Sequence, residues 1–233
     1  METIDTIALM LGAAWASGIN LYAAILVLGW LGGSGHITLP PDLQLLSDPL
    51  VLLAAGGMYG IEFFADKIPG VDTGWDALHT FIRIPAGALM AAGAAQGFDI
   101  GPAAELAALL AGGGIAGVSH AAKAGTRVMI NTSPEPFSNW GASVAEDAAV
   151  VGGLWTALYN PWLFLGLFIL FVLAVAWLLP RLWRTLRRAV AAVRRWLSPA
   201  PATTTSAAHV SRRREVLDAL YAPDNDQAKG PPL

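Results

Sequence analysis

The sequence predicts an all-α polytopic membrane helix bundle of about six spans, with broken or re-entrant helices. Of its 233 residues, 55% are hydrophobic and only 13% are charged, whereas soluble domains carry about 25% charged residues. The mean hydropathy is +0.54. The 25 glycines and 15 prolines exclude a set of uninterrupted long helices. The chain contains no cysteine, which excludes disulfides, iron–sulfur clusters, thiolate zinc sites and cysteine nucleophiles.

Residues 161–179 form the clearest predicted span. The segment is uncharged, and about 20 apolar residues cross the hydrocarbon core of a bilayer. Trp162 and Trp177 stand near its two ends, where interfacial aromatic side chains are typical. Six arginines follow between residues 181 and 195, and such an excess marks the cytoplasmic side. We therefore expect a multi-pass protein of the bacterial inner (plasma) membrane with a cytoplasmic C-terminal side.

Five further spans are predicted upstream, at residues 4–31, 50–66, 77–96, 103–124 and 141–159. The first is too long for one straight helix and contains Gly18-Ile19-Asn20. This motif predicts a broken helix whose free backbone groups face protein or water. Six crossings place the N-terminal side in the cytoplasm as well. The outer loops at 32–49 and 97–102 then contain no Lys or Arg, in agreement with the positive-inside rule.

The charge distribution divides the chain into three predicted parts. Residues 1–180 contain 13 acidic and four basic residues, whereas residues 181–233 contain four acidic and ten basic ones. We assign 1–180 to a transmembrane domain, 181–197 to a basic amphipathic juxtamembrane helix and 198–233 to a disordered cytoplasmic tail. The arginine collar at 181–197 either binds anionic lipids or only fixes the topology. Besides the lipid bilayer, a homo-oligomer is favoured by the Gly- and Ala-rich helices, and no nucleic-acid partner is expected.

The ionisable residues of the apolar body gather mainly in two stretches, 62–83 and 120–147. A charged group at the bilayer centre costs about 2.5–3.5 kcal/mol, so this concentration predicts a polar site. Spacings of three and four residues put Asp76, His79 and Arg83 on one helix face. His120, Lys123 and Arg127 repeat that rhythm. Packed together, the two stretches would satisfy each other's charges or enclose a polar cavity at the inner side of the membrane.

The candidate site residues fall into three groups. The predicted ion- or substrate-binding residues are Glu62, Asp66, Asp72, Asp76, His79, His120, Glu146 and Asp147. The predicted counter-ions or anion-binding residues are Lys67, Arg83, Lys123 and Arg127. The supporting polar residues are Asn20, Asn131, Ser133, Glu135, Ser138 and Asn139. Individual members also have structural explanations, as helix caps, turns or interior histidines with satisfied hydrogen bonds.

Three stretches, Gly18–Tyr22, Glu62–Asp72 and Ser133–Asn139, resemble the bacterial domain-of-unknown-function family 4126. Shorter motifs around Asp76, Lys123 and Glu146 fit the same pattern. The resemblance covers roughly residues 5–180, and the collar and tail lie outside it. It implies a multi-spanning inner-membrane protein, and it does not supply a reaction.

The polar site predicts a small inner-membrane transporter or channel for a cation or a proton-coupled solute. Carboxylates suit hard cations, and a histidine would extend the range to manganese, iron or zinc. A bound metal ion is therefore left open, and no organic cofactor is expected. Two alternatives stay open: a non-catalytic scaffold or assembly protein, and a binder of an anionic solute or lipid phosphate. The chain has no Gly-x-Ser-x-Gly or His-Glu-x-x-His motif, and we expect no enzymatic activity.

Overall fold

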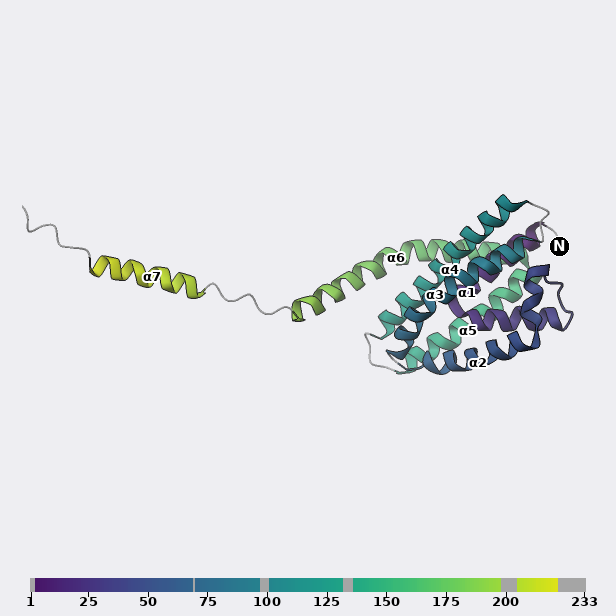
Figure 1. Ribbon diagram of the computed structural model, residues 1–233, viewed down its shortest axis with the longest axis horizontal. Coiled ribbons are helices and arrows are strands. Elements are labelled where there is room, and N and C mark those ends of the chain that lie inside the picture. The colour runs from purple at the N-terminus through teal and green to yellow at the C-terminus, as the bar shows by residue number, and fades with distance from the viewer. Residues whose placement is uncertain (1–2, 69, 97–100, 132–135, 198–204, 222–233) are drawn as a thin grey trace, which may run out of the picture. The chain divides into compact units, whose positions relative to one another are not determined.

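The computed structural model describes residues 3–68, 70–96, 101–131, 136–197 and 205–221. These residues are all-α, which confirms the predicted class. The helices are α1 (Thr3–Gly33), the 3-10 helix η1 (Pro41–Ser47), α2 (Pro49–Ala65), α3 (Val71–Ala95), α4 (Pro102–Ile130), α5 (Pro136–Tyr159), α6 (Pro161–Leu197) and α7 (Thr205–Leu220) (Figure 1). The chain forms two compact units, Met1–Thr185 and Leu186–Leu233.

Three of the described helical segments are long and apolar enough to cross a membrane, namely Thr3–Gly33, Pro102–Ile130 and Pro161–Arg181. The pair formed by η1 and α2, bent by 64°, is a fourth candidate. The predicted spans at 77–96 and 141–159 are also helical, as α3 and α5. Composition does not mark α3 as a span, because its inward face carries several buried charged and polar side chains.

Two predictions concern the C-terminal part of the chain. The amphipathic helix predicted at 181–197 is the continuation of α6, which passes Pro180 without ending. Helix α7 lies within the segment 198–233, for which the sequence predicts a disordered tail. Alanine, arginine and leucine make up half of α7, and these residues have high helix propensity.

Helices α3 and α4 pack against each other along stripes with the same layout. From Asp72 to Met90 in α3, and along most of α4, the buried residues recur every three or four positions, as expected for a helix with one inward face. One half of each stripe is charged and the other half consists mostly of glycine and alanine. In the half that consists of small residues, a Cβ added to Gly112 would lie 2.8 Å from the carbonyl oxygen of Gly87. The small residues thus bring the two backbones close together, and the charged halves are held side by side.

Asn20 breaks α1 into two helical halves, at the motif that predicts a break. Its backbone leaves helical geometry, with φ −145° and ψ 97°. Its Oδ1 accepts a hydrogen bond from the Ala23 amide at 3.0 Å, which caps the second half. At 1.5 Å per residue, the halves are about 25 and 20 Å long. Each half is therefore shorter than a hydrocarbon core of about 30 Å.

The two halves of α1 return to the same end of the bundle. In the first half, Gly12 lies against Ala157, near the end of α5. In the second half, Leu31 lines a cavity of about 470 Å³ together with Trp155, again near the end of α5. Between these positions, the break contacts Asp147, in the middle of α5. Helix α1 is therefore a hairpin (Figure 1), and the break at Asn20, which contacts Asp147, is its tip.

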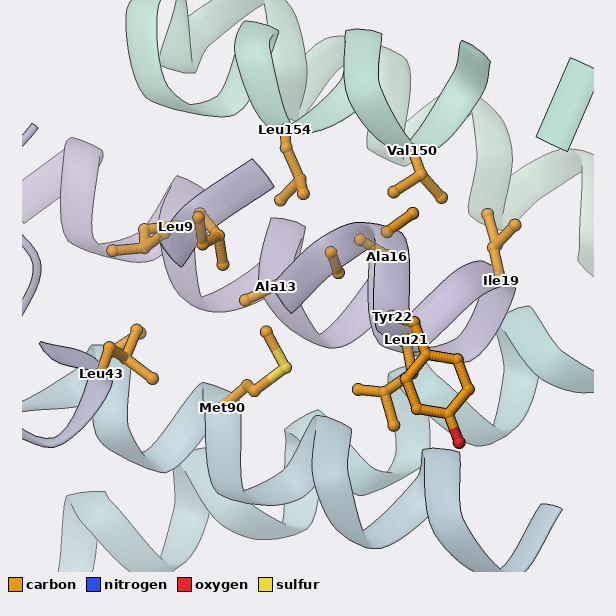
Figure 2. Close-up of a cluster of buried hydrophobic side chains, with 14 of the residues drawn as sticks. Leu9, Ala13, Ala16, Ile19, Leu21, Tyr22, Leu43, Met90, Val150 and Leu154 are labelled. Atoms are coloured by element: carbon orange, nitrogen blue, oxygen red, sulfur yellow. The ribbon is translucent and has the colours of Figure 1, made fainter. Parts of the chain in front are cut away.

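The apolar core surrounds this hairpin. Figure 2 shows Val150 and Leu154 of α5 on one side of α1 and Met90 of α3 on the other, with Leu9 and Ala13 among the buried α1 residues. Between helices in lipid, close packing supplies much of the attraction, since lipid tails are as apolar as the side chains. This packing fixes the position of the tip relative to α3 and α5.

We expect Gly18→Ala to destabilise the bundle, because Gly18 lies directly against the Ala116 carbonyl of α4. An added Cβ would also lie 2.6 Å from the Ser119 Cβ, so α1 and α4 would have to separate. The expected loss is about 1–3 kcal/mol, seen as a lower melting temperature in detergent. Gly57→Ala is the control, since a Cβ there meets nothing within 4 Å. Equal melting temperatures for the two variants would contradict the close contact.

Candidate functional site

The candidate functional site is a buried network of seven ionisable side chains from the two stretches that the sequence singles out. It comprises the carboxylates of Glu62, Asp66, Asp76 and Glu146 and the cations of Arg83, Lys123 and Arg127. The side chain of Glu146 is 15% exposed, and the other six residues are at most 5% exposed. These side chains come from α2, α3, α4, α5 and the residue that follows α2, so the network depends on how these four helices pack together.

Lys123 occupies the centre of the network. Its Nζ lies 3.2 Å from Glu62 Oε1 and 3.0 Å from Asp66 Oδ2. The same atom is 3.6 Å from Asp76 Oδ1 and 3.5 Å from Glu146 Oε2. One ammonium group therefore contacts all four carboxylates, which we call the carboxylate cage.

Two arginines hold the cage from outside, and each binds two of its carboxylates. Arg83 donates from Nη2 to Glu62 Oε1 at 2.5 Å and from Nη1 to Asp76 Oδ1 at 3.1 Å. Arg127 donates from Nη2 to Glu146 Oε2 at 2.7 Å and to Asp66 Oδ2 at 3.3 Å. The guanidinium groups thus set the spacing of the cage, since their planar N–H donors have fixed directions.

Arg127 also binds backbone groups near two helix ends. Its Nη1 donates to the carbonyl of Asp66, which follows α2, at 3.1 Å. The same nitrogen donates to the carbonyl of Asn139, in the first turn of α5, at 3.0 Å. The end of α2 and the start of α5 are therefore joined through one side chain of α4.

The described network contains one more carboxylate than it has cations. Each of Glu62, Asp66 and Asp76 also has one buried carboxylate oxygen without a hydrogen-bond partner. The Nε of Arg83 is likewise buried without a hydrogen-bond partner. Uncompensated charge inside a protein is costly, because the low-dielectric interior solvates it poorly. A proton or another monovalent cation bound to the network would remove this imbalance.

The two predicted histidines differ in their relation to the network. His120 Nδ1 lies 3.3 Å from Arg83 Nη1 and must accept, because a guanidinium only donates. Its Nε2 then donates to Thr80 Oγ1 at 2.8 Å. His79 lies outside the network: its Nδ1 donates to the Trp75 carbonyl at 2.9 Å, and its Nε2 lies 3.0 Å from the Tyr22 hydroxyl.

Asp147 and Asn20 meet at the tip of the α1 hairpin. Asn20 Nδ2 donates to Asp147 Oδ1 at 2.9 Å, and the Tyr59 hydroxyl donates to Asp147 Oδ2 at 2.8 Å. The carboxylate also lies near the N-terminal end of the second half of α1, where the helix dipole favours a negative charge. Ser17 ties the same tip to α3 by donating to the Arg83 carbonyl at 3.0 Å.

Asp72 forms a separate cluster at the connections between helices. Asn131 Nδ2 donates to both of its carboxylate oxygens, at 2.9 and 2.8 Å. Asp72 also accepts from the Gly70 amide at 2.8 Å, at the start of α3. Asn139 Nδ2 donates to Asn131 Oδ1 at 2.8 Å. These contacts join the start of α3 to the end of α4 and the start of α5, and they place Asp72 outside the carboxylate cage.

Of the remaining predicted residues, the structure describes Lys67 and Ser138. Lys67 Nζ donates to the Phe63 carbonyl at 2.9 Å and lies over the Phe63 ring. Burial lowers the pKa of this amine, which stands beyond the last residue of α2. Ser138 is exposed on α5. Ser133 and Glu135 lie outside the described residues.

Sequence reasoning missed the hydroxyl groups that complete these contacts: Ser17, Tyr22, Tyr59 and Thr80. Two signals could have found some of them. Tyr22 belongs to the stretch that contains the helix break, and Thr80 stands four residues after Asp76. As to metals, no three or more His, Asp or Glu side chains in the described ranges are arranged to hold an ion. The cage carboxylates are bound by lysine and arginine instead.

The chain matches a known protein family over a range that includes both the hairpin of α1 and the network. No curated protein and no solved structure is significantly similar to the chain. Residues 7–181 match the model of the family described as Domain of unknown function (DUF4126). The match spans most of the chain, from the first half of α1 to the start of the arginine collar. The chain therefore belongs to the DUF4126 family.

Proposed function

We propose that this protein is an inner-membrane transporter whose buried network carries a proton, coupled to the movement of a cation or another solute. The single observation that supports it most is the excess of carboxylates over cations, together with unpartnered oxygens on Glu62, Asp66 and Asp76. A group that must release and rebind a proton needs two charge states of similar energy. A buried network with one surplus negative charge provides them, because protonation makes it neutral.

The hairpin of α1 supports the same proposal. Its tip at Asn20 reaches the middle of α5, and the network occupies the space toward the connections that follow α2 and α4. Broken helices that end inside the bundle are typical of secondary transporters, where they form binding sites and hinges. The tip contacts three helices, through Arg83 of α3, Ala116 of α4 and Asp147 of α5. A displacement of the tip would therefore change the surroundings of the network.

The hairpin also changes the proposed topology. We propose that α2, α3, α4, α5 and α6 cross the membrane and that α1 enters and leaves on the outer side. This gives five crossings instead of the six expected from the sequence, so Thr3 lies outside and the collar stays in the cytoplasm. Lys67, Lys123 and Arg127 remain on the inner side, in accordance with the positive-inside rule.

Cysteine labelling tests this topology directly, since the chain contains no cysteine. In intact cells with a permeable outer membrane, an impermeant maleimide should label Thr3→Cys and leave Ser206→Cys unlabelled. Both should react after the inner membrane is opened, which controls for accessibility. Labelling of neither variant in intact cells would support the six-span arrangement and contradict a re-entrant α1.

Proton flux in reconstituted vesicles tests the function. The purified full chain is placed in vesicles that contain a pH-sensitive dye, and gradients of Na⁺, K⁺ or ammonium-type cations are imposed in turn. We expect a cation gradient to drive proton movement above the level of protein-free vesicles. Proton movement at the protein-free level for every gradient would contradict a proton-coupled cation transporter.

The two alternatives receive less support from the geometry. A binder of anionic solutes would use Arg83, Lys123 or Arg127, but carboxylates already hold all three cations. A scaffold would use the network only to fix the fold, and it would show no flux. Binding of anionic lipids by the collar and formation of a homo-oligomer remain proposals that rest on the sequence alone.

A further inference from the structure

We propose that the carboxylate cage is a binding site for a small monovalent cation with N–H donors, such as ammonium or a primary alkylammonium, and that Lys123 is its built-in occupant. The inference rests on the proposed function and deepens it, because it names the class of cation that the transporter takes. It depends on the arrangement of the cage around one atom.

The four carboxylates of the cage are arranged around one position, the Nζ of Lys123, and do not form a single ion pair with it. Four carboxylates from three other parts of the fold contact the same Nζ, at distances from 3.0 to 3.6 Å. A lysine that served only to neutralise one carboxylate would need a single partner. Here the cage surrounds the end of the side chain, as a site surrounds a bound ion.

The three cations of the network have different roles in this arrangement. Arg83 and Arg127 lie at the edges, and each holds two carboxylates in place. Their planar donors fit those pairs and remain charged. Lys123 carries a compact ammonium on a flexible four-carbon stem. If this stem moved aside, the two arginines would still hold the four carboxylates around an empty position.

The distances and the charge indicate the class of ligand. The separations of 3.2 and 3.0 Å from Glu62 and Asp66 suit N–H donors, whereas the bonds of Mg²⁺ and Ca²⁺ to oxygen are shorter, about 2.0–2.6 Å. Without Lys123, four carboxylates would face two arginines, so the vacated cage would attract a cation. The unpartnered oxygens of Glu62, Asp66 and Asp76 are further acceptors for N–H groups. An ammonium or alkylammonium ion can therefore take the place of the lysine.

Thermal unfolding of the full chain in detergent tests the inference. Wild type and Lys123→Ala are heated with methylammonium, tetramethylammonium, Na⁺ or K⁺ at equal ionic strength. Tetramethylammonium has the same charge as methylammonium but no N–H donor. We expect methylammonium, near ten times its Kd, to raise the Tm of wild type by about 3–6 °C more than tetramethylammonium does. Lys123→Ala should respond at lower concentrations, because no resident ammonium competes.

Two control variants locate the effect. Lys67→Ala removes a lysine outside the cage and should respond as wild type does. Glu62→Gln in the Lys123→Ala background should reduce the methylammonium response. Equal shifts with methylammonium and tetramethylammonium in wild type would overturn the proposal, and this measurement suffices even if Lys123→Ala does not fold. Equal shifts with methylammonium, Na⁺ and K⁺ would overturn the assignment to N–H donors.

The unfolding experiment on the cage and the flux experiment on the proposed function can fail independently of each other. Proton-coupled flux without selective methylammonium binding would overturn the cage as the cation site and leave a transporter. Selective binding without any flux would overturn transport and leave a cation-binding membrane protein.

Discussion

Arg83→Met is expected to lower the free energy of unfolding by about 3–5 kcal/mol, the range for removing one partner of a buried ion pair. Arg83 is fully buried and contacts Glu62 and Asp76. The substitution keeps much of the apolar volume but leaves the carboxylates of Glu62 and Asp76 with Lys123 as their nearest cation. The measurement is chemical or thermal unfolding in detergent, and we expect a low yield of folded protein.

A double substitution separates charge from packing. Combining Arg83→Met with Glu62→Gln restores the charge balance to that of wild type, so we expect part of the lost stability to return. The difference between the double and single variants gives the coupling energy of the pair. Additive effects would contradict the close contact between these side chains. A fully stable Arg83→Met variant would show that the network does not hold the fold together.

Glu62→Gln is expected to abolish proton flux while the protein stays folded. The amide oxygen of glutamine can still accept from Arg83 and Lys123, as Glu62 Oε1 does. The substitution removes one negative charge, so the network becomes permanently neutral, like its protonated form. Stability should therefore be retained or slightly increased, whereas the release of a proton from this position is no longer possible. Dye-loaded vesicles measure the flux, and melting in detergent measures the stability.

Glu105→Gln is the matched control for this experiment. Glu105 is exposed in the first turn of α4, far along the helix from the charged stretch. The same change of charge there should leave both flux and melting temperature close to wild type. If Glu62→Gln lowers stability and leaves the flux unchanged, the network is structural and the scaffold hypothesis gains support.

Much of the site could be predicted because helical periodicity is a local property. Spacings of three and four residues place Asp76 and Arg83 on one face of α3, and Lys123 and Arg127 on one face of α4, and both faces are buried. The scarcity of charge elsewhere in the body indicated that these faces would meet. The break at Asn20 could also be predicted, since Gly18-Ile19-Asn20 has low helix propensity.

The remaining features depend on contacts between distant segments. Lys123 contacts Asp66 and Glu146 because of how α2 and α5 pack on α4, and no periodicity in one helix encodes that packing. The reversal of α1 has the same origin. Low helix propensity predicts where α1 breaks, but such a break is compatible with both a kinked span and a hairpin. Packing against both Ala157 and Trp155 of α5 decides between them.

The hairpin of α1 has a consequence for biosynthesis. Asn20 leaves the ribosome long before its partner Asp147, which follows 127 residues later. Until then, the side-chain amide of Asn20 lacks the carboxylate that accepts its hydrogen bond, and a lipid environment cannot replace it. With the proposed topology, we therefore expect α1 to remain at the translocon or the membrane surface at this stage. We expect α1 to reach its final position only after α5, which carries Asp147, has been inserted.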